Sequence, residues 1–493
     1  MITILTTTNY NSSITKAITS IDRLNELVTV VSNTEDIDKA SKLLIVEDDL
    51  ISTTLDWHDT EPPYVFPKVN FTSNNLLALV FYKLGNQQKA FEFLSEENTL
   101  YHHLLTATHL QFGYDISDEM LSKVEVLHNQ CIIQHYGNYS NRCNTEQLKD
   151  LYLKAIESAS NDEIKIFSAK HYSNLLLDVN AFKSAEKLMR SLQEKAISPE
   201  AKNAIDIQLA SALMAQLQLP YDSNKLDEIS ELFQKGIRFY ESMNLKVNAG
   251  LLYVDASEIA NFKDDYIESK NLINKAILIF KEEDIPEFLG EAGLRKATLL
   301  YMWSKNGSPQ YYKPAINAFQ DTLKVFKRDT HPQKFADVHH NLALIYSEIP
   351  VSAEEKPIWT AFCASSFKEV LKFYTKENYP YQFAMASHNY ATALMSFPEA
   401  KLHNNLDKAF GMFEDALTVR TADNYAFERA LTLTNQLELY WLIHNENSEE
   451  ESKKYNAMLD KANEIKELVS DQALIEKANE HLEALKNLKT ILN

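Results

Sequence analysis

Phe335-Ala-Asp-Val-His-His-Asn-Leu-Ala343 and Phe383-Ala-Met-Ala-Ser-His-Asn-Tyr-Ala391 are two copies of one pattern. Phe, Ala, His, Asn and Ala recur at a spacing of 48 residues, and Pro350 and Pro398 follow the two copies at the same distance. Self-similarity at a period of roughly 34–50 residues is typical of a solenoid of stacked helix pairs. Residues 332–420 therefore predict a helical repeat array.

The segments between these copies repeat as well. Residues 319–325, 367–373 and 413–419 share one arrangement of Phe, Leu and a final apolar residue, at spacings of 48 and then 46. Upstream, residues 233–240 and 273–280 continue the same series at spacings of 40 and 46. The repeat thus begins well before residue 332 and lengthens along the chain.

Residues 74–94 contain the clearest single unit. Leu77, Ala78 and Phe81 form an apolar stripe, Gly85 marks a turn, and Ala90 is the small residue that lets a second helix approach. This order of residue types resembles the tetratricopeptide repeat. The resemblance implies an all-α fold, a right-handed α-solenoid of about eight to nine antiparallel helix pairs with a concave groove.

Two turns of the array are longer than the minimal motif. Residues 348–357 and 397–405 replace a link of a few residues, and such lengthening leaves a solenoid intact. Repeats with long linkers resemble the arrays found beside CHAT-type protease domains and in bacterial signalling proteins. The resemblance implies a bacterial signalling context, although no catalytic domain of that type is evident in the sequence.

The sequence predicts three regions. Residues 1–65 are expected to form an N-terminal helical cap or degenerate repeat, with helices over 13–31 and 36–51; a small separate fold is the alternative. Residues 66–446 form the repeat array. Residues 447–493 are amphipathic and charged on one face, as expected of C-terminal capping helices.

Composition restricts the class of protein. The chain has 493 residues, of which 45% are hydrophobic, and only 9 are glycine and 13 proline, which favours long helices with short turns. The net charge of −20 disfavours nucleic acid as a partner and favours basic segments. Three cysteines are too few for a disulfide framework, and no signal peptide or long apolar run is evident. We therefore expect an acidic cytoplasmic protein without membrane contact.

Signatures of catalysis and cofactor binding are not evident. The glycines form neither a Walker A nor a dinucleotide-binding pattern, and no nucleophile elbow is present. His128, Cys131, His135 and Cys143 have zinc-compatible side chains, but their spacing matches no familiar zinc finger. We predict no enzyme, no cofactor and no metal site, with a zinc-dependent enzyme built on these four residues as an alternative.

Polar residues on the expected first helices of the later repeats form a ladder. The resemblance to the tetratricopeptide repeat implies that the following residues face the groove: Arg295, His340, Asn341, His388, Asn389, Thr392, Thr434, Asn435 and Glu438. Asn side chains at successive repeats offer a donor and an acceptor to an extended backbone. Alternatively, Asn341, Asn389 and Asn435 hydrogen-bond neighbouring helices inside the array. Both interpretations remain open at the level of sequence.

The predicted function is a non-enzymatic scaffold or adaptor. A peptide segment or partner protein is expected to bind these nine residues in the concave groove of the repeat array. The alternative is a peptide-responsive regulatory sensor that changes the pitch of the array on binding.

Overall fold

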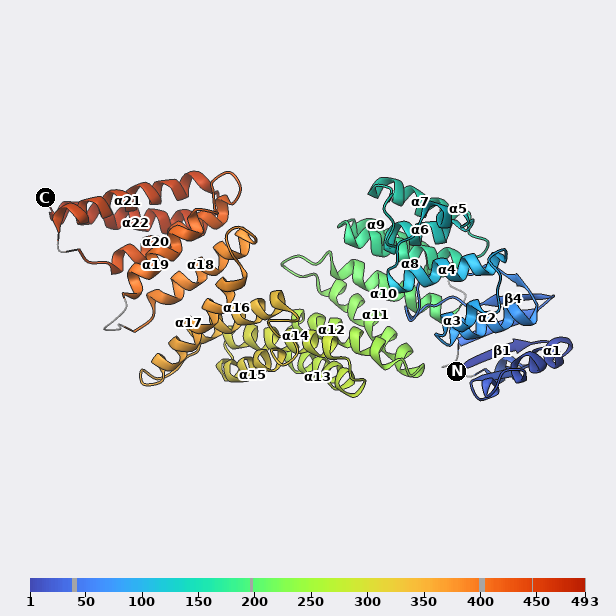
Figure 1. The fold of residues 1–493 in the computed structure, drawn as a ribbon. Coiled ribbons are helices and arrows are strands. Elements are labelled where there is room, and N and C mark those ends of the chain that lie inside the picture. The colour runs from blue at the N-terminus through green and yellow to red at the C-terminus, as the bar shows by residue number, and fades with distance from the viewer. Residues whose placement is uncertain (38–41, 196–197, 399–403, 446, 493) are drawn as a thin grey trace. The chain divides into compact units, whose positions relative to one another are not determined.

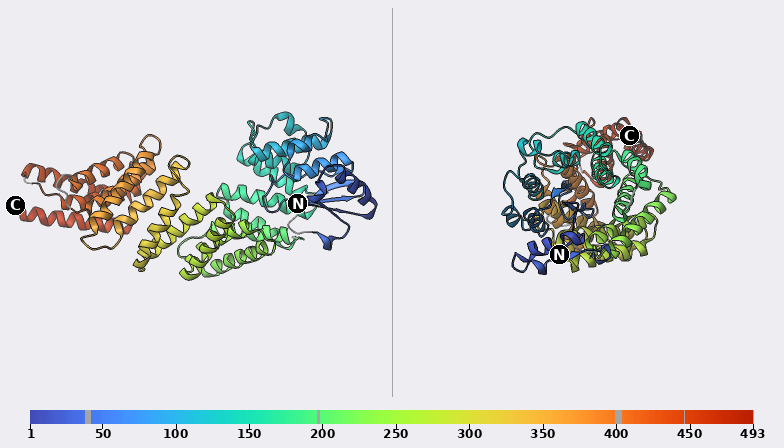
Figure 2. Two further views of the ribbon diagram at one scale, coloured as in Figure 1. Left: turned by 60° about the horizontal axis from the view of Figure 1, so that its bottom comes forward. Right: turned by 90° about the vertical axis from the view of Figure 1, so that its right-hand side faces the viewer.

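The structure is a computed structural model that describes residues 1–37, 42–195, 198–398, 404–445 and 447–492 (Figure 1). The chain divides into two compact units, Met1–Ile279 and Phe280–Asn493, which we call the first unit and the second unit. Within each unit, helices that follow one another in the chain pack side by side (Figure 2). The predicted α-solenoid is confirmed.

A five-stranded sheet with one helix begins the first unit. The strand order is β2-β1-β3-β4-β5; β1 pairs in parallel with β2 and β3, and β3, β4 and β5 pair antiparallel. The elements are β1 (Ile2–Thr6), α1 (Thr8–Thr19), β2 (Val28–Val31), β3 (Lys42–Glu47), β4 (Leu50–Thr53) and β5 (Val69–Asn70), with 3-10 turns at Leu24–Glu26 and Thr34–Asp36.

The prediction of a helical cap over residues 1–65 is therefore wrong, and so are the helices expected over 13–31 and 36–51, apart from residues 13–19 in α1. Residues 38–41 lie outside the described residues. Strands β2 and β3 have 4 and 6 residues, most of them apolar, and are too short for their periodicity to separate strand from helix. Asp48 and Asp49, which lie within the helix expected over 36–51, both have positive φ (51° and 58°). They form the two-residue turn that joins β3 to β4 as a hairpin.

The sheet does not have a core of its own. Ile4, Leu44 and Val46 of the sheet belong to the same buried cluster as Leu77 and Leu104 of the following helices. The alternative, a small separate fold for residues 1–65, therefore does not form either. The sheet is the first layer of the first unit, and the helices continue from it.

The helices of the first unit follow in tandem. They are α2 (Ser73–Lys83), α3 (Gln87–Phe91), α4 (Thr99–Phe112), α5 (Asp118–Ser122), α6 (Leu127–Tyr136), α7 (Thr145–Glu157), α8 (Asp162–Asp178), α9 (Phe182–Leu192), α10 (Pro199–Met214), α11 (Ser223–Ser242), α12 (Lys246–Phe262) and α13 (Tyr266–Glu282), with a 3-10 turn at Gln193–Lys195. Helix α13 continues across the boundary between the units.

The second unit holds the repeats that reveal the fold. Its helices are α14 (Pro286–Lys305), α15 (Tyr312–Thr322), α16 (Pro332–Glu348), α17 (Lys356–Phe373), α18 (Pro380–Met395), α19 (Asn405–Leu417), α20 (Ala426–Leu442), α21 (Ser448–Leu468) and α22 (Gln472–Leu492), with a 3-10 turn at Pro309–Tyr311. The repeated Phe367 and Phe413 are fully buried, and Phe367 stacks on Tyr390 with 4.8 Å between ring centroids. The repeated residues are therefore core residues.

Many of the array's helices end in the same turn. At Gly85, Asn180, Asn244, Asp264 and Gly307, φ is positive, and the next residue's N–H bonds to the carbonyl five residues before it. This is the Schellman turn, which needs a left-handed residue. Because Asn and Asp tolerate that conformation, the array forms with few glycines.

Among the described residues, no helix is long and apolar enough to cross a membrane.

Candidate peptide-binding surfaces

The predicted ladder lies on α14, α16, α18 and α20 of the second unit. Asn389 of α18 donates through Nδ2 to Nε2 of His340 on α16, at 2.9 Å. Asn435 of α20 approaches Nε2 of His388 at 3.4 Å and donates to Oγ1 of Thr392 at 3.0 Å. The ladder therefore links three successive first helices to one another.

The two ladder histidines are neutral at pH 7. Burial lowers the pKa of His340 to about 4, and burial together with the Arg420 charge lowers the pKa of His388 to about 4. A neutral ring has one acceptor nitrogen, which is Nε2 here because Asn Nδ2 can only donate. Nδ1–H of His388 then donates to Oγ1 of Thr432 at 3.2 Å.

The other ladder residues differ in how far their side chains are exposed to solvent. Thr392 and Glu438 are exposed, and Asn341 is half-buried with its Nδ2 bonded to the carbonyl of Asp337 in the same helix. Arg295 is half-buried on α14. Thr434 is 2% exposed and donates to the carbonyl of Ala430, so its side chain presents no surface to a partner.

A second surface, which the sequence did not predict, lies in the first unit. Residues 54–68 connect β4 to β5, which are neighbours in the sheet, so this connection leaves the sheet and returns to the same edge. We call residues 54–68 the finger. They contain no helix or strand and lie against α2, α4, α6, α8, α11 and α12.

The outgoing half of the finger contacts α8 and α12. Trp57 is buried and meets Phe167 edge-on, with 5.2 Å between ring centroids. Lys170 donates to the Trp57 carbonyl at 3.1 Å and to both carboxylate oxygens of Asp59 at 2.7 and 2.8 Å. Asn248 donates to the His58 carbonyl at 3.4 Å. The helices thus hold this half mainly by its carbonyls and one carboxylate.

The returning half is held by α4 and α6. The side-chain amide of Asn129 accepts from N–H and donates to C=O of Val65, both at 2.8 Å. Nε2 of His128 bonds the Pro63 carbonyl at 2.8 Å, and the Tyr64 hydroxyl bonds Nδ1 of His103 at 2.8 Å. Asn129 therefore pairs with the finger as a neighbouring strand would.

Ion pairs of Glu61 also hold the finger in place. Glu61 contacts Lys83 and Lys42 at 2.5 Å each. Burial raises the pKa of Glu61, but these two lysines outweigh it and hold the pKa below its usual value. The acidic groups of the finger therefore meet lysines from both the sheet and the helices.

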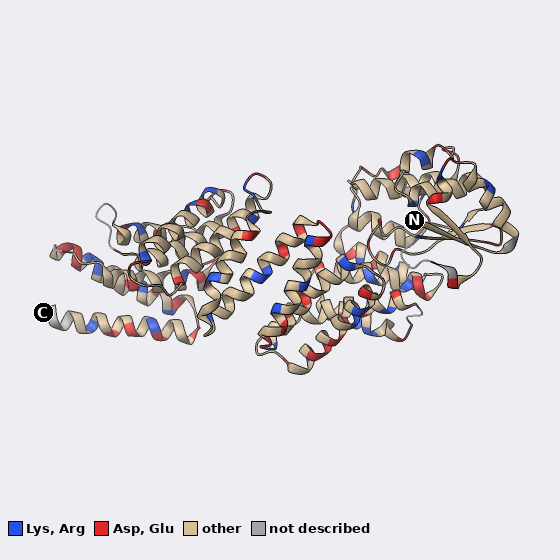
Figure 3. Cartoon of the chain, turned by 90° about the horizontal axis from the view of Figure 1, so that it is seen from below, with Lys and Arg blue, Asp and Glu red and all other residues tan. Residues whose placement is uncertain are grey.

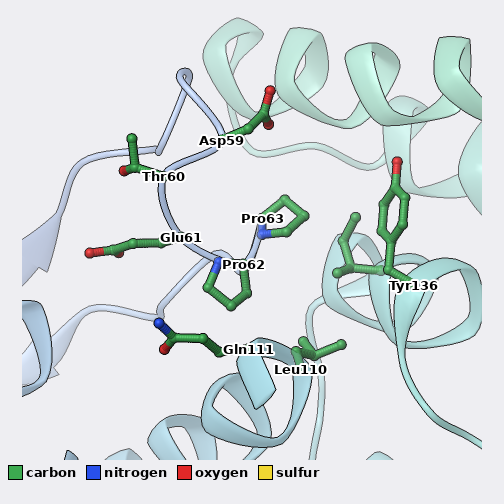
Figure 4. A pocket seen from close by; sticks show the side chains of 9 residues that line it. Asp59, Thr60, Glu61, Pro62, Pro63, Leu110, Gln111 and Tyr136 are labelled. Carbon is green, nitrogen blue, oxygen red and sulfur yellow. The ribbon is translucent and has the colours of Figure 1, made fainter. Parts of the chain in front are cut away.

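A pocket of about 250 Å³ remains between the finger and the helices. Figure 4 shows Pro63 near its centre, with Leu110 and Gln111 of α4 on one side and Tyr136 of α6 on another. The Tyr136 hydroxyl accepts from Nδ2 of Asn174 at 3.3 Å. The finger thus covers the helices without filling the space between them.

The four residues of the zinc alternative are used separately. Both ring nitrogens of His128 bond protein atoms, Pro63 O and Ser168 Oγ, and His135 bonds the Tyr152 hydroxyl at 2.9 Å. Burial raises the pKa of Cys131 to about 12, which disfavours the thiolate that zinc requires. Within the described ranges, no group of three His, Cys, Asp or Glu residues is placed to hold a metal ion.

Sequence reasoning did not single out Asn129 or Lys170. One signal was present: His128-Asn129 is the same dipeptide as His340-Asn341 and His388-Asn389 of the ladder. Pro62-Pro63, between Trp57 and Tyr64, belongs to the segment that these helix side chains hold.

Tandem helix pairs joined by left-handed turns give this chain an α-solenoid fold, which is the fold that its resemblance to the tetratricopeptide repeat predicts. No family model and no curated protein matches the sequence. Among solved structures, it is similar to the human IFIT1 dimer with m7Gppp-AAAA (13% identity, 85% of this chain and 90% of that chain covered, TM-score 0.35). Yeast Tom70 (12%, 85% and 96%, 0.23) and the P58(IPK) TPR domain (13%, 84% and 98%, 0.21) are also similar.

Proposed function

We propose that the protein is a non-enzymatic scaffold that binds an extended segment of a partner protein on the first helices of the second unit. One observation carries the proposal. In the first unit, helix side chains already hold a stretch of polypeptide without helix or strand by its main chain. The second unit presents the same residue types, Asn and His, on successive helices, which favours the same kind of ligand.

The available surface consists of Asn341, Asn389, Asn435, Thr392 and Glu438, all half-buried or exposed. The hydrogen bonds within the ladder use Nδ2 of each Asn, so each Oδ1 remains able to accept an N–H from a partner. Positive and negative residues are interspersed along the helices of both units (Figure 3), and the net charge is −20. This balance favours a neutral or basic segment and disfavours nucleic acid.

Site-specific photocrosslinking tests the proposal. A photoreactive phenylalanine analogue replaces Asn341 or Thr392 in the full chain, and crosslinked peptides are identified by mass spectrometry in cells of the native host. The matched control replaces Lys372 on α17, whose side chain is 63% exposed outside the ladder. We expect one partner segment to crosslink from the two ladder positions and not from the control.

The identified segment is then synthesised and titrated against the purified protein. Replacing both Asn341 and Asn435 by Ala should weaken binding by about tenfold to a hundredfold, as expected for two lost main-chain contacts. Equal crosslinking from position 372, or binding that the double variant leaves unchanged, would overturn the proposal.

A further inference from the structure

We propose that the surface of α4, α6, α8 and α12 beneath the finger is a peptide-binding site in its own right. The finger is its resident ligand, and an acidic, aromatic segment of a partner protein binds there when the finger leaves. This site lies in the first unit and is separate from the surface proposed above. The two proposals rest on different residues and are tested separately.

The site recognises main chain. Asn129 forms two hydrogen bonds with one residue of the finger, and His128 and Asn248 each bond a carbonyl. Asn129 is fully buried and His128 is 2% exposed. Bonds to main-chain atoms do not depend on which side chains the ligand carries, so a different extended segment satisfies them equally well.

The charge of the site defines the ligand further. The side chain of Lys170 is only 8% exposed, and the finger supplies its carboxylate through Asp59. A buried ammonium group without an anion is strongly unfavourable, so any replacement for the finger must bring a carboxylate to the same place. Phe167 beside it requires an aromatic or large apolar group where Trp57 now lies.

Together these contacts describe a peptide. It carries an aromatic residue, has Asp or Glu two residues later in a turn like that at Asp59, where φ is 57°, and presents a carbonyl and then a paired N–H and C=O six and eight residues after the aromatic. These intervals are those of Trp57, Asp59, Pro63 and Val65. An acidic segment of this kind differs from the neutral or basic segment expected on the second unit.

The finger leaves part of the site unused. Besides the pocket of about 250 Å³, Nε2 of His171 on α8 has no hydrogen-bond partner within the described residues. His171 is 3% exposed and lies beside Tyr136, which lines the pocket. A partner segment that fills the pocket gains contacts that the finger lacks. A finger from a second copy of the chain would gain nothing, which favours another protein as the source.

The finger is joined to the sheet by only a short strand. Strand β5 has two residues and two paired positions, and among residues 54–68 only Trp57, Tyr64 and Val65 are buried. The bonds that hold the finger are therefore those of the site together with the ion pairs of Glu61 with Lys42 and Lys83. A competing segment that takes over those bonds releases the finger without unfolding the sheet.

The test uses a fluorescent peptide with the sequence of residues 55–66 and the full chain. Fluorescence anisotropy should give binding to Trp57→Ala that is at least about tenfold tighter than binding to the unchanged protein, because the resident ligand is weakened. Asn129→Ala in the Trp57→Ala background should reduce it again by a similar factor. Asn463→Ala in that background is the matched control and should leave it unchanged, because Asn463 is an exposed residue of α21 whose amide bonds the Leu459 carbonyl of its own helix, outside both proposed surfaces.

A second measurement needs no variant. In the unchanged protein, the Val65 amide is protected from hydrogen exchange by Asn129, and millimolar peptide should accelerate its exchange while amides of α16 keep their rates. Equal peptide affinity of the Trp57→Ala and unchanged proteins, or no acceleration at Val65, would overturn the inference. A concentration-dependent dimer of Trp57→Ala in light scattering would show that a second copy is the occupant and would overturn the assignment to a partner.

Discussion

At the scale of single residues, the same side-chain type performs different tasks in the two units. The amide of Asn129 is fully buried and satisfies both main-chain groups of Val65. The amide of Asn341 is half-buried and bonds only a carbonyl of its own helix. Stability should therefore depend strongly on the first residue and weakly on the second.

Replacing Asn129 by Ala should lower the free energy of unfolding of the first unit by about 2–4 kcal/mol, because it leaves the N–H and C=O of Val65 without partners. Asn341→Ala is the control and should cost less than about 1 kcal/mol. Urea unfolding followed by circular dichroism measures both. Equal losses in the two variants would contradict the structural role given to Asn129.

The ladder histidines predict an acid-sensitive second unit. Their pKa is about 4 in the folded chain and 6.5 ordinarily, so the unfolded chain binds more protons below pH 6.5. Stability is fully present above about pH 6.5 and is lost as the pH falls toward 4, by on the order of 3 kcal/mol for each ring. Urea unfolding between pH 7.5 and 4.5 measures this loss.

His340→Asn keeps a polar side chain at this position and removes the titrating ring. We expect it to flatten the pH dependence of stability compared with the unchanged protein. A variant with the full original slope would show that other groups cause the acid sensitivity.

At the scale of helices and strands, the left-handed turns explain how a chain with 9 glycines builds so many short connections. Asn244 follows α11 with φ of 57°, and the N–H of the next residue bonds the Tyr240 carbonyl at 2.9 Å. The conformation is tolerable for Asn, easy for glycine and costly for alanine.

Asn244→Ala should therefore destabilise the first unit by about 1 kcal/mol, whereas Asn244→Gly should be neutral or stabilising. Thermal unfolding of the two variants side by side measures the difference. If both variants had the same midpoint, the turn would not depend on its left-handed residue.

The helices were predictable because their signal is local and repeated. Leu77, Ala78, Phe81 and Gly85 lie within one helix and its turn, and the pattern recurs at the repeat spacing. The sheet was not predictable, because β2 and β3 are short apolar runs and their pairing partners lie elsewhere in the chain.

The two candidate sites also differ in how far the sequence predicts them. Asn389 and Asn435 lie on the successive first helices α18 and α20, and each bonds a histidine of the preceding first helix; that a partner binds them stays a prediction. Contacts of the finger join residues 64, 113 and 190 positions apart in the chain. No local pattern encodes such distances, so the second surface was visible only in three dimensions.

At the scale of the whole molecule, one loop contacts helices from α2 to α12 of the first unit. Replacing residues 56–66 by a Gly-Ser linker of equal length should increase hydrogen exchange in α6 and α8, because Asn129, His128 and Lys170 lose their partners. Amides of α16 and α18 are the internal control and should exchange at unchanged rates. Faster exchange throughout both units would mean that the variant is globally destabilised, and unchanged exchange in α6 and α8 would contradict a stabilising role for the finger.

Because the finger is tethered at both ends to neighbouring strands, it rebinds at an effective concentration on the order of millimolar. A free segment of equal intrinsic affinity, with a Kd of about 1 μM for the vacant site, would then show an apparent Kd near 1 mM. Tethering therefore prevents weakly binding segments from displacing the finger, even when they are abundant. A segment displaces it only if it makes additional contacts with the site, or if its protein is held nearby by a second interaction.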